Sequence, residues 1–92
     1  MFNIKEAPEL FYIGEDPKHP DGQLQYSYED KVLVIWHTEV GDSLKGQGAA
    51  SALVAYAVDY ARRQGIKITP FCPYALAQFQ KHPEYADVWF KD

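Results

Sequence analysis

Residues 37–50, with the sequence HTEVGDSLKGQGAA, constrain the fold of this chain more than any other segment. They follow an apolar run that is typical of a strand and lead directly into the longest helical pattern of the chain, from about Gly48 to Gln64. A helix leaves its first backbone N–H groups unpaired and carries partial positive charge at that end. A strand, a glycine loop and a helix in this order therefore indicate an anion-binding site.

The residues of this loop suit a bound anion. Gly46 and Gly48 remove side chains where a ligand must approach the backbone, and they allow φ values that most residues avoid. The first turn of the helix contains no Asp or Glu, and the first acid in the helix is Asp59. In an alternative interpretation, Asp42 or Ser43 caps the helix and the glycines only form a turn. The pattern alone leaves both interpretations open.

The length of 92 residues, 47% of them hydrophobic, predicts one domain over residues 1–92 with a single core. No run approaches the roughly 20 apolar residues of a membrane span, and the first residues lack the apolar region of a signal peptide. We therefore expect a cytoplasmic protein with no membrane partner. The single cysteine, Cys72, excludes an internal disulfide, and the three histidines show no metal-ligand spacing, so no metal site is expected.

The formal net charge of −4 argues against a nucleic-acid partner, which requires a basic face. The charges are unevenly distributed, because residues 1–46 hold nine acids and four lysines, whereas residues 47–92 hold four acids and five bases. The first half therefore favours cationic partners and the second half tolerates anionic ones. Scattered acids can also be solvated surface charges without a partner.

Alternation and turn residues predict a mixed α/β chain. Short strands are expected over residues 2–5, 10–13, 23–29 and 32–38, forming an antiparallel meander, with a loop at 15–22. The 32–38 run, VLVIWHT, is apolar on both faces and predicts a central strand. After the helix, residues 66–69 predict a strand, so that residues 32–71 form a right-handed βαβ crossover with parallel strands. A short helix follows from Pro73, and residues 84–92 are too apolar for a free tail.

The main helix has an apolar stripe that should face the sheet, comprising Ala50, Leu53, Ala57, Tyr60 and Ala61. Gly65 is a natural end for it. The carboxyl ends of the two parallel strands, near Thr38 and Phe71, then open on the same side as the glycine loop. Ligands of α/β sheets bind in such crevices.

Four segments together carry a family resemblance: HTEV at 37–40, KGQGAA at 45–50, PFCPY at 70–74 and KHPEY at 81–85. Over roughly residues 22–89 the chain resembles the minimal, YjdJ-like branch of the GNAT N-acetyltransferase superfamily. The resemblance implies an acetyl-CoA-binding fold in which the glycine loop holds the pyrophosphate and the pantetheine lies between two splayed parallel strands. It assigns cofactor binding to Val40, Lys45, Gly46, Gln47, Gly48, Ala49, Ala50, Cys72, Pro73 and Tyr74.

The chain departs from the superfamily pattern at two places. Lys45 occupies the position where the superfamily signature has Gln or Arg, which leaves the glycine and alanine pattern intact. Typical members also insert two helices after the first strand, which wall the acceptor site, whereas only residues 15–22 are available here. The acceptor side should therefore be open, which suits a protein tail or a partner subunit.

Acetyl transfer to an amine requires a base, a polarised thioester carbonyl and an acid for the leaving thiolate. His37 and Glu39 share one strand face if the strand is regular, and either could be the base. The resemblance suggests the backbone N–H of Val40 or its neighbours for the carbonyl oxygen and Tyr74 for the acid. Each residue also has a structural interpretation, His37 as a core histidine, Glu39 as a loop carboxylate and Tyr74 as a packing ring.

Cys72 lies at the end of the second parallel strand, immediately before Pro73, and is the expected N-cap of the following helix. That position favours a thiolate and predicts an unusually reactive thiol. Its role could be a transient acetyl acceptor, a hydrogen-bond partner of the CoA sulfur, or a small packing residue.

These observations predict an acetyl-CoA-dependent N-acetyltransferase that acts on an amine, such as a protein lysine or N-terminus, as a monomer or weak homodimer. The alternative is a non-catalytic CoA-binding or protein-interaction module with the same fold. A nucleotide P-loop is poorly supported, because no G-x-x-x-x-G-K-[ST] is present.

Overall fold

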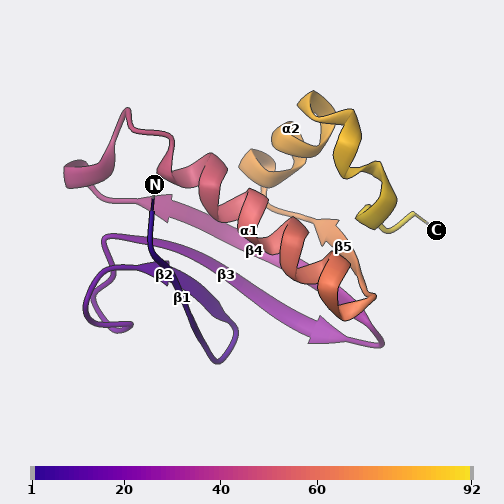
Figure 1. Cartoon of the computed structure of the whole chain (residues 1–92), viewed down its shortest axis with the longest axis horizontal. Coiled ribbons are helices and arrows are strands. Elements are labelled where there is room, and N and C mark those ends of the chain that lie inside the picture. Colours follow the sequence, from indigo (N-terminus) through magenta and orange to yellow (C-terminus); the bar gives the residue numbers. More distant parts are fainter. Residues whose placement is uncertain (1, 92) are drawn as a thin grey trace.

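A single five-stranded sheet of order β1-β2-β3-β4-β5 forms the centre of the computed structural model, which describes residues 2–91 (Figure 1). The strands are β1 Ile4–Ala7, β2 Leu10–Ile13, β3 Gly22–Glu29, β4 Val32–Val40 and β5 Lys67–Pro70. The first four pair antiparallel, and β5 pairs parallel with β4. The predicted meander and βαβ crossover are confirmed, although the first strand lies two residues later than predicted and the last lies one residue later.

A two-residue turn joins β3 to β4. Asp30 and Lys31 both adopt positive φ, 51° and 64°, which is the backbone of a type I′ turn. The backbone of this turn matches the right-handed twist of the paired strands. The hairpin of β3 and β4 contributes most of the residues of the sheet. The hairpin between β1 and β2 turns at Glu9, whose φ is 58°.

A β-bulge interrupts the pairing of β3 with β4. Gln25 pairs with His37 and Tyr26 pairs with Ile35, which leaves Trp36 as the extra residue. Before the bulge, Leu33 and Ile35 are buried in the core. Beyond it the alternation is shifted by one residue, so that the exposed side chains are those of His37 and Glu39. One face of the sheet is therefore open, and the Trp36 side chain is 49% exposed on it. The prediction that residues 32–38 form a central strand is confirmed, because β4 lies between β3 and β5.

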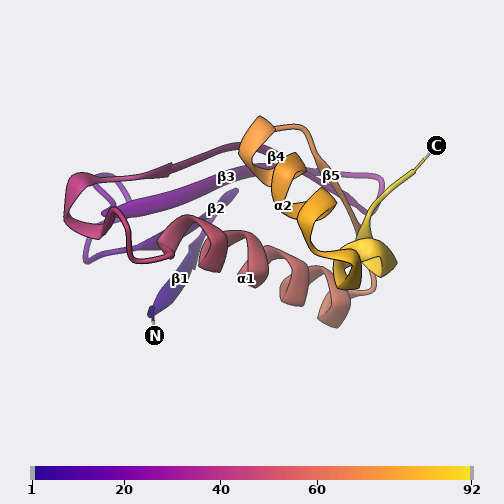
Figure 2. The same cartoon turned by 90° about the horizontal axis from the view of Figure 1, so that it is seen from above.

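The long helix α1, Ala49–Gln64, covers the other face of the sheet, and the shorter helix α2, Pro73–Lys81, packs beside it at the β5 side (Figures 1 and 2). One cluster of buried residues joins both helices to the sheet. The core side of α1 comprises Ala49, Leu53, Val54, Ala57, Val58 and Ala61. Ala50 and Tyr60 are only partly buried, so the predicted stripe was rotated: Val54 and Val58 take the core positions instead.

The C-terminal segment packs against β5, as its apolar residues predicted. Pro83–Val88 forms a short 3₁₀ helix, η2, and Trp89 then makes a parallel bridge to Ile68. The N–H of Phe90 donates to the carbonyl of Ile68 at 2.7 Å, which supplies a partner at the outer edge of β5. Arg62 at the end of α1 holds the segment by a bidentate pair with Asp87, with both bonds at 2.8 Å.

The end of α1 and the start of α2 lie at the residues that the sequence predicted. Gly65, with φ of 70°, ends α1 and donates its N–H to the last turn of the helix. Cys72 is the N-cap of α2, with Pro73 at its first position. Across residues 2–91, no helix combines the length and apolar character that a membrane crossing would need.

Four tyrosines that are buried or partly buried make stability sensitive to alkaline pH. Burial raises the pKa of Tyr26, Tyr56, Tyr74 and Tyr85 above the usual value of 10.0. Because the folded pKa exceeds the unfolded one, the contribution of these phenols to stability is complete below about pH 10 and declines as the pH rises through the folded values. We expect Tm to be insensitive to tyrosine ionisation up to pH 9 and to fall above pH 10.

Thermal unfolding followed by circular dichroism between pH 7 and 11 checks this expectation. Tyr85→Phe is the informative variant, because Tyr85 is only 9% exposed. Its Tm should fall less steeply above pH 10 than that of the unaltered chain. Identical slopes for the two proteins would show that Tyr85 does not contribute to the alkaline transition.

Candidate functional site

The parallel pairing of β4 with β5 stops half-way along β4. The register runs from Val32 opposite Lys67 to Ile35 opposite Pro70, after which the Cys72 N–H donates to the Ile35 carbonyl at 2.9 Å. β4 continues to Val40, while the other chain turns away into α2. Within residues 2–91, no strand pairs with β4 on this edge beyond Ile35. The predicted splay of two parallel strands is confirmed.

The direction of the Val40 N–H follows from the pairing on the opposite edge of β4. Gly41 donates its N–H to the Asp21 carbonyl at 2.8 Å, on the β3 side. Successive amides of an extended strand point to opposite edges. The Val40 N–H therefore points to the edge that β5 has left, where the resemblance placed an oxyanion donor.

The glycine loop leads into the start of α1, which lies beside this splay and has no side-chain cap. Gly46 and Gly48 have φ of 77° and 81°, and Gly48 is the N-cap of α1 without a side-chain hydrogen bond. The first turn of α1 contains no acid. Asp42 instead begins the 3₁₀ turn η1, Asp42–Leu44, and pairs with Lys45 at 3.0 Å between two exposed side chains. The alternative that Asp42 or Ser43 caps this helix is therefore wrong.

A cavity of about 340 Å³ lies in front of the helix start. It is lined by Val40, Leu44, Lys45, Gly46, Gly48, Ala49, Ala50, Ser51 and Tyr74. No carboxylate is among these residues, and Lys45 is the charged one. A Cβ added at Gly46 would meet nothing within 4 Å, and one at Gly48 only the Ser51 hydroxyl at 3.7 Å. The open space, the free helix start and the single cation fit an anionic group such as a pyrophosphate.

Three residues that the resemblance assigned to the cofactor are not in the lining of this cavity. Gln47 turns back into the loop, where its Nε2 donates to the Ser43 carbonyl at 3.0 Å. Pro73 is exposed at the start of α2. Cys72 is 5% exposed, and its Sγ–H donates to the Thr38 Oγ1 at 3.7 Å across the splay. Cys72 is the N-cap of α2, as predicted, and its thiol makes no capping hydrogen bond to the helix.

Tyr74 reaches the cavity from the first turn of α2, opposite the start of α1. Burial raises the pKa of its phenol, and a hydrogen bond with Ser51 partly opposes this effect. The phenol therefore stays protonated at neutral pH and can donate a proton. Ser51 also donates to the Gly48 carbonyl at 3.0 Å, which ties the helix start to its N-cap.

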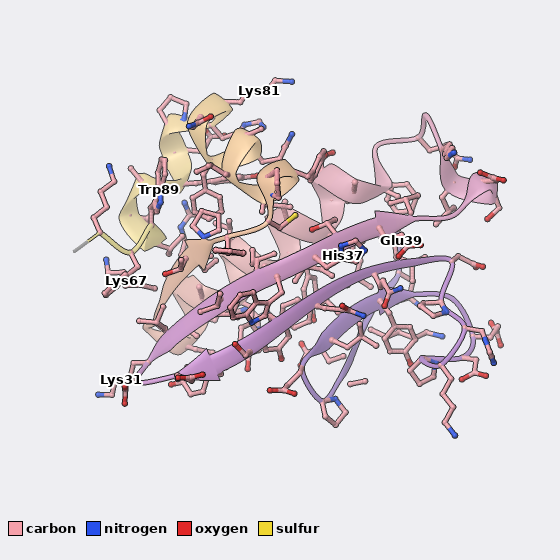
Figure 3. All side chains as sticks on the ribbon, turned by 180° about the vertical axis from the view of Figure 1, so that it is seen from behind. Lys31, His37, Glu39, Lys67, Lys81 and Trp89 are labelled. Carbon is pink, nitrogen blue, oxygen red and sulfur yellow. The ribbon has the colours of Figure 1, made fainter. Side chains whose placement is uncertain are left out.

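His37 and Glu39 lie on the open face of β4, on the other side of the sheet from the helices (Figure 3). The His37 Nε2 and the Glu39 Oε1 are 3.1 Å apart, and the two side chains are 53% and 62% exposed. The predicted common face is thus confirmed, although the strand is not regular, since the bulge lies immediately before His37. His37 is not a core histidine.

Sequence reasoning missed Thr38, Leu44 and Ser51. Ser51 could have been found, because a hydroxyl in the first turn of a helix often bonds to nearby backbone. Thr38 faces Cys72 only because the bulge shifts the alternation of β4, and no residue of the strand indicates a bulge. Leu44 enters the cavity through the turn η1, which the sequence pattern did not predict.

Comparisons with known proteins agree on one family. Residues 10–88 match the family described as GCN5-related N-acetyl-transferase. The solution structure of a GCN5-like candidate N-acetyltransferase from Staphylococcus aureus is similar to this chain, with 32% identity and a TM-score of 0.81 over 99% of this chain and 90% of that one. No curated protein sequence matches the chain.

Two larger proteins share the fold at lower identity. A candidate acetyltransferase from Agrobacterium tumefaciens has 24% identity and a TM-score of 0.58, over 87% of this chain and 59% of that one. The ribosomal-protein-S18-alanine N-acetyltransferase of Escherichia coli has 13% identity and a TM-score of 0.61, over 83% of this chain and 53% of that one. This chain spans little more than half of these two proteins.

The splayed strands, the glycine loop and these matches define a GNAT-type acetyltransferase fold, with the mixed sheet that the sequence predicted. The chain belongs to the GCN5-related N-acetyl-transferase family, a family of acyltransferases. The matches do not distinguish the YjdJ-like branch within it. Across residues 2–91, no three His, Cys, Asp or Glu side chains are grouped as a metal site would require.

The burial of Cys72 makes a testable prediction about its accessibility. Because the side chain is 5% exposed, we expect iodoacetamide to alkylate the thiol at least about tenfold more slowly in the native protein than in urea. Mass spectrometry at matched pH measures both rates, and the rates are corrected with a model thiol in the same solutions. Equal rates would indicate the reactive, accessible thiol that the N-cap position alone predicted.

Proposed function

We propose that this protein is an acetyl-CoA-dependent N-acetyltransferase that transfers acetyl to an amine on the open face of its sheet. One observation carries the proposal. Where β5 leaves β4, the acid-free start of α1 lies on one side of the sheet and the His37–Glu39 pair lies on the other. A cofactor that passes through the splay could therefore be held on the helix side and react on the open side.

The loop amides are the groups that would hold the cofactor. Gly46, Gly48, Ala49 and Ala50 line the cavity, the last three at the start of α1, and Lys45 adds an exposed cation beside them. Bound acetyl-CoA supplies an acetyl group activated as a thioester. We expect Lys45 to contribute less than the amides, since an exposed charge is screened by salt.

The His37–Glu39 pair is the proposed base. An amine acceptor is protonated at neutral pH and cannot attack a carbonyl until a proton is removed. The hydrogen bond between the two side chains orients the imidazole, so that the pair can take this proton directly or through water. Both groups are reachable from solvent, which allows an incoming amine to meet them first.

Val40 and Tyr74 are assigned the remaining two roles. The Val40 N–H points into the splay and is the proposed donor to the oxygen on which charge develops. Tyr74, whose pKa is raised by burial, is the proposed acid for the leaving thiolate. Cys72 belongs to the buried core cluster and contacts Thr38 across the splay, and its three candidate roles are the acetyl acceptor, the partner of the CoA sulfur, and packing.

A non-catalytic CoA-binding or protein-interaction module is the second candidate. The observation in its favour is that His37 and Glu39 are both more than half exposed and so are not held in a dry pocket. Release of free thiol from acetyl-CoA in the presence of a panel of amines separates the two functions. Binding without acceptor-dependent thiol release favours the module. A cytoplasmic location and a monomer or weak homodimer remain predictions.

Charge at the helix start tests the cofactor site. Ala50→Glu places a carboxylate in the first turn of α1, where the helix field favours it, so the fold should be retained. Like charges a few ångströms apart near a protein surface repel by up to about 4 kcal/mol, and we expect the Kd for CoA to rise at least about tenfold. Ala55→Glu is the matched control, since Ala55 is exposed in the middle of α1. Calorimetric titration of CoA that shows equal affinities for both variants would place the cofactor elsewhere.

Kinetics test the assigned acid and base. We expect Glu39→Gln and Tyr74→Phe each to lower kcat roughly 10- to 100-fold, because general acid–base groups contribute about 10²–10⁴-fold and water can replace them in an exposed site. The Kd for CoA should change by less than about threefold in Glu39→Gln, which is on the other face of the sheet from the cavity. Full activity in both variants, measured by thiol release, would leave these residues without a catalytic role.

A further inference from the structure

A groove of about 660 Å³ lies on the open face of the sheet. Its floor includes Gln23 and Gln25 of β3 and the bulged Trp36 of β4. One wall is the loop at 15–22, which contributes Pro17, Lys18 and Pro20.

Strand register places the groove directly beside the proposed base. Gln23 pairs with Glu39, and Gln25 pairs with His37. Cross-strand partners project their side chains from the same face of a sheet, at about 5 Å between Cβ atoms. The groove therefore continues into the His37–Glu39 pair without an intervening strand, and whatever occupies it presents its end to that pair.

Trp36 forms a fixed aromatic surface in this groove. Its Nε1 donates to the Ser27 Oγ at 2.7 Å, and its ring packs against Phe71 with the centroids 5.0 Å apart. Although it is held at two sides, the Trp36 side chain is 49% exposed. An exposed indole held in one orientation can bind the methylene stem and the ammonium of a lysine side chain.

The polar groups of the groove suit a polypeptide that carries a positive charge. Gln25 donates its Nε2 to the Gln23 Oε1 at 3.2 Å, which leaves an amide donor on Gln23 and an amide acceptor on Gln25 for a peptide group. Two carboxylates, Glu9 in the lining and Glu39 at its end, outnumber the one ammonium of Lys18. A groove of this size also exceeds what a small amine would fill.

We infer that this groove is the acceptor site and that the acceptor is a lysine side chain on an extended polypeptide segment. This inference rests on the proposed function. The lysine stem lies along Trp36, and its ammonium loses a proton to the His37–Glu39 pair. The neutral nitrogen forms a bond to the thioester carbonyl carbon, the carbon–sulfur bond breaks, and the sulfur receives a proton from Tyr74. The nitrogen, now part of an amide, gives its second proton through water to the Tyr74 phenolate, and the His37–Glu39 pair returns the first proton to solvent.

The test compares three substrates. They are a randomised library of N-terminally blocked octapeptides with one lysine, a library with free N-termini and no lysine, and n-butylamine, each with acetyl-CoA. We expect the lysine library to be acetylated with a kcat/KM at least about tenfold above that of n-butylamine. Preference for free N-termini, or equal rates for the lysine library and n-butylamine, would overturn the lysine assignment.

Two variants locate the acceptor in the groove. Glu9→Arg reverses a charge that lies two strands away from His37, and Trp36→Leu removes the aromatic surface. Each should raise the KM for the lysine library roughly three- to tenfold, while the Kd for CoA changes less than twofold; Trp36→Leu should also raise the KM for n-butylamine, which shares the lysine stem. Glu29→Arg is the matched control, because Glu29 is exposed at the far end of β3 and should change none of these values.

The outcomes separate the two proposals. If CoA binds and n-butylamine is acetylated, but Glu9→Arg and Trp36→Leu leave the KM for the lysine library unchanged, the groove is not the acceptor site and the proposed function stands. If no amine causes thiol release, both proposals fail. Circular dichroism melts of each variant confirm that a changed KM does not reflect an unfolded protein.

Discussion

The end of the β4–β5 ladder at Ile35 and Pro70 is the feature on which the rest of the site depends. Backbone N–H groups are obligatory donors, and a sheet normally satisfies them from both neighbours. From Thr38 to Val40, β4 has a neighbour on the β3 side, whereas β5 has turned into α2. The start of α1 presents further free N–H groups beside the same opening. Two sets of unpaired donors thus face one cavity, and an elongated ligand with acceptors along its length could satisfy both.

The bulge at Trp36 divides the chemistry between the two faces of the sheet. Without it, the alternation that buries Leu33 and Ile35 would place His37 and Glu39 on the helix side. With it, Thr38 meets Cys72 across the splay, and the His37–Glu39 pair is exposed on the open face. One extra residue therefore separates the proposed cofactor side from the proposed acceptor side. The same residue provides the aromatic surface of the groove.

Local patterns were sufficient for most of the fold. Alternation identified β2 to β4, and Gly65, Pro73 and Pro83 set the ends of the helices, because these signals act within a few residues. The glycine loop was identified for the same reason. The sequence did not reveal the bulge, so the apolar run at 32–38 predicted a central strand but not the exposed side chain of Trp36. Contacts between distant segments could not be judged from the sequence, and the bond of the Cys72 thiol to Thr38, 34 residues away, is one of them.

The central claim is that the backbone N–H groups at the start of α1 and in the splay bind the cofactor. Titration of the ¹⁵N-labelled protein with CoA, followed by amide chemical shifts, observes those groups directly. The largest shifts should occur at Gly46, Gly48, Ala49 and Val40, with little change in β1 or in η2. Binding that leaves these four amides unshifted while others move would contradict the account.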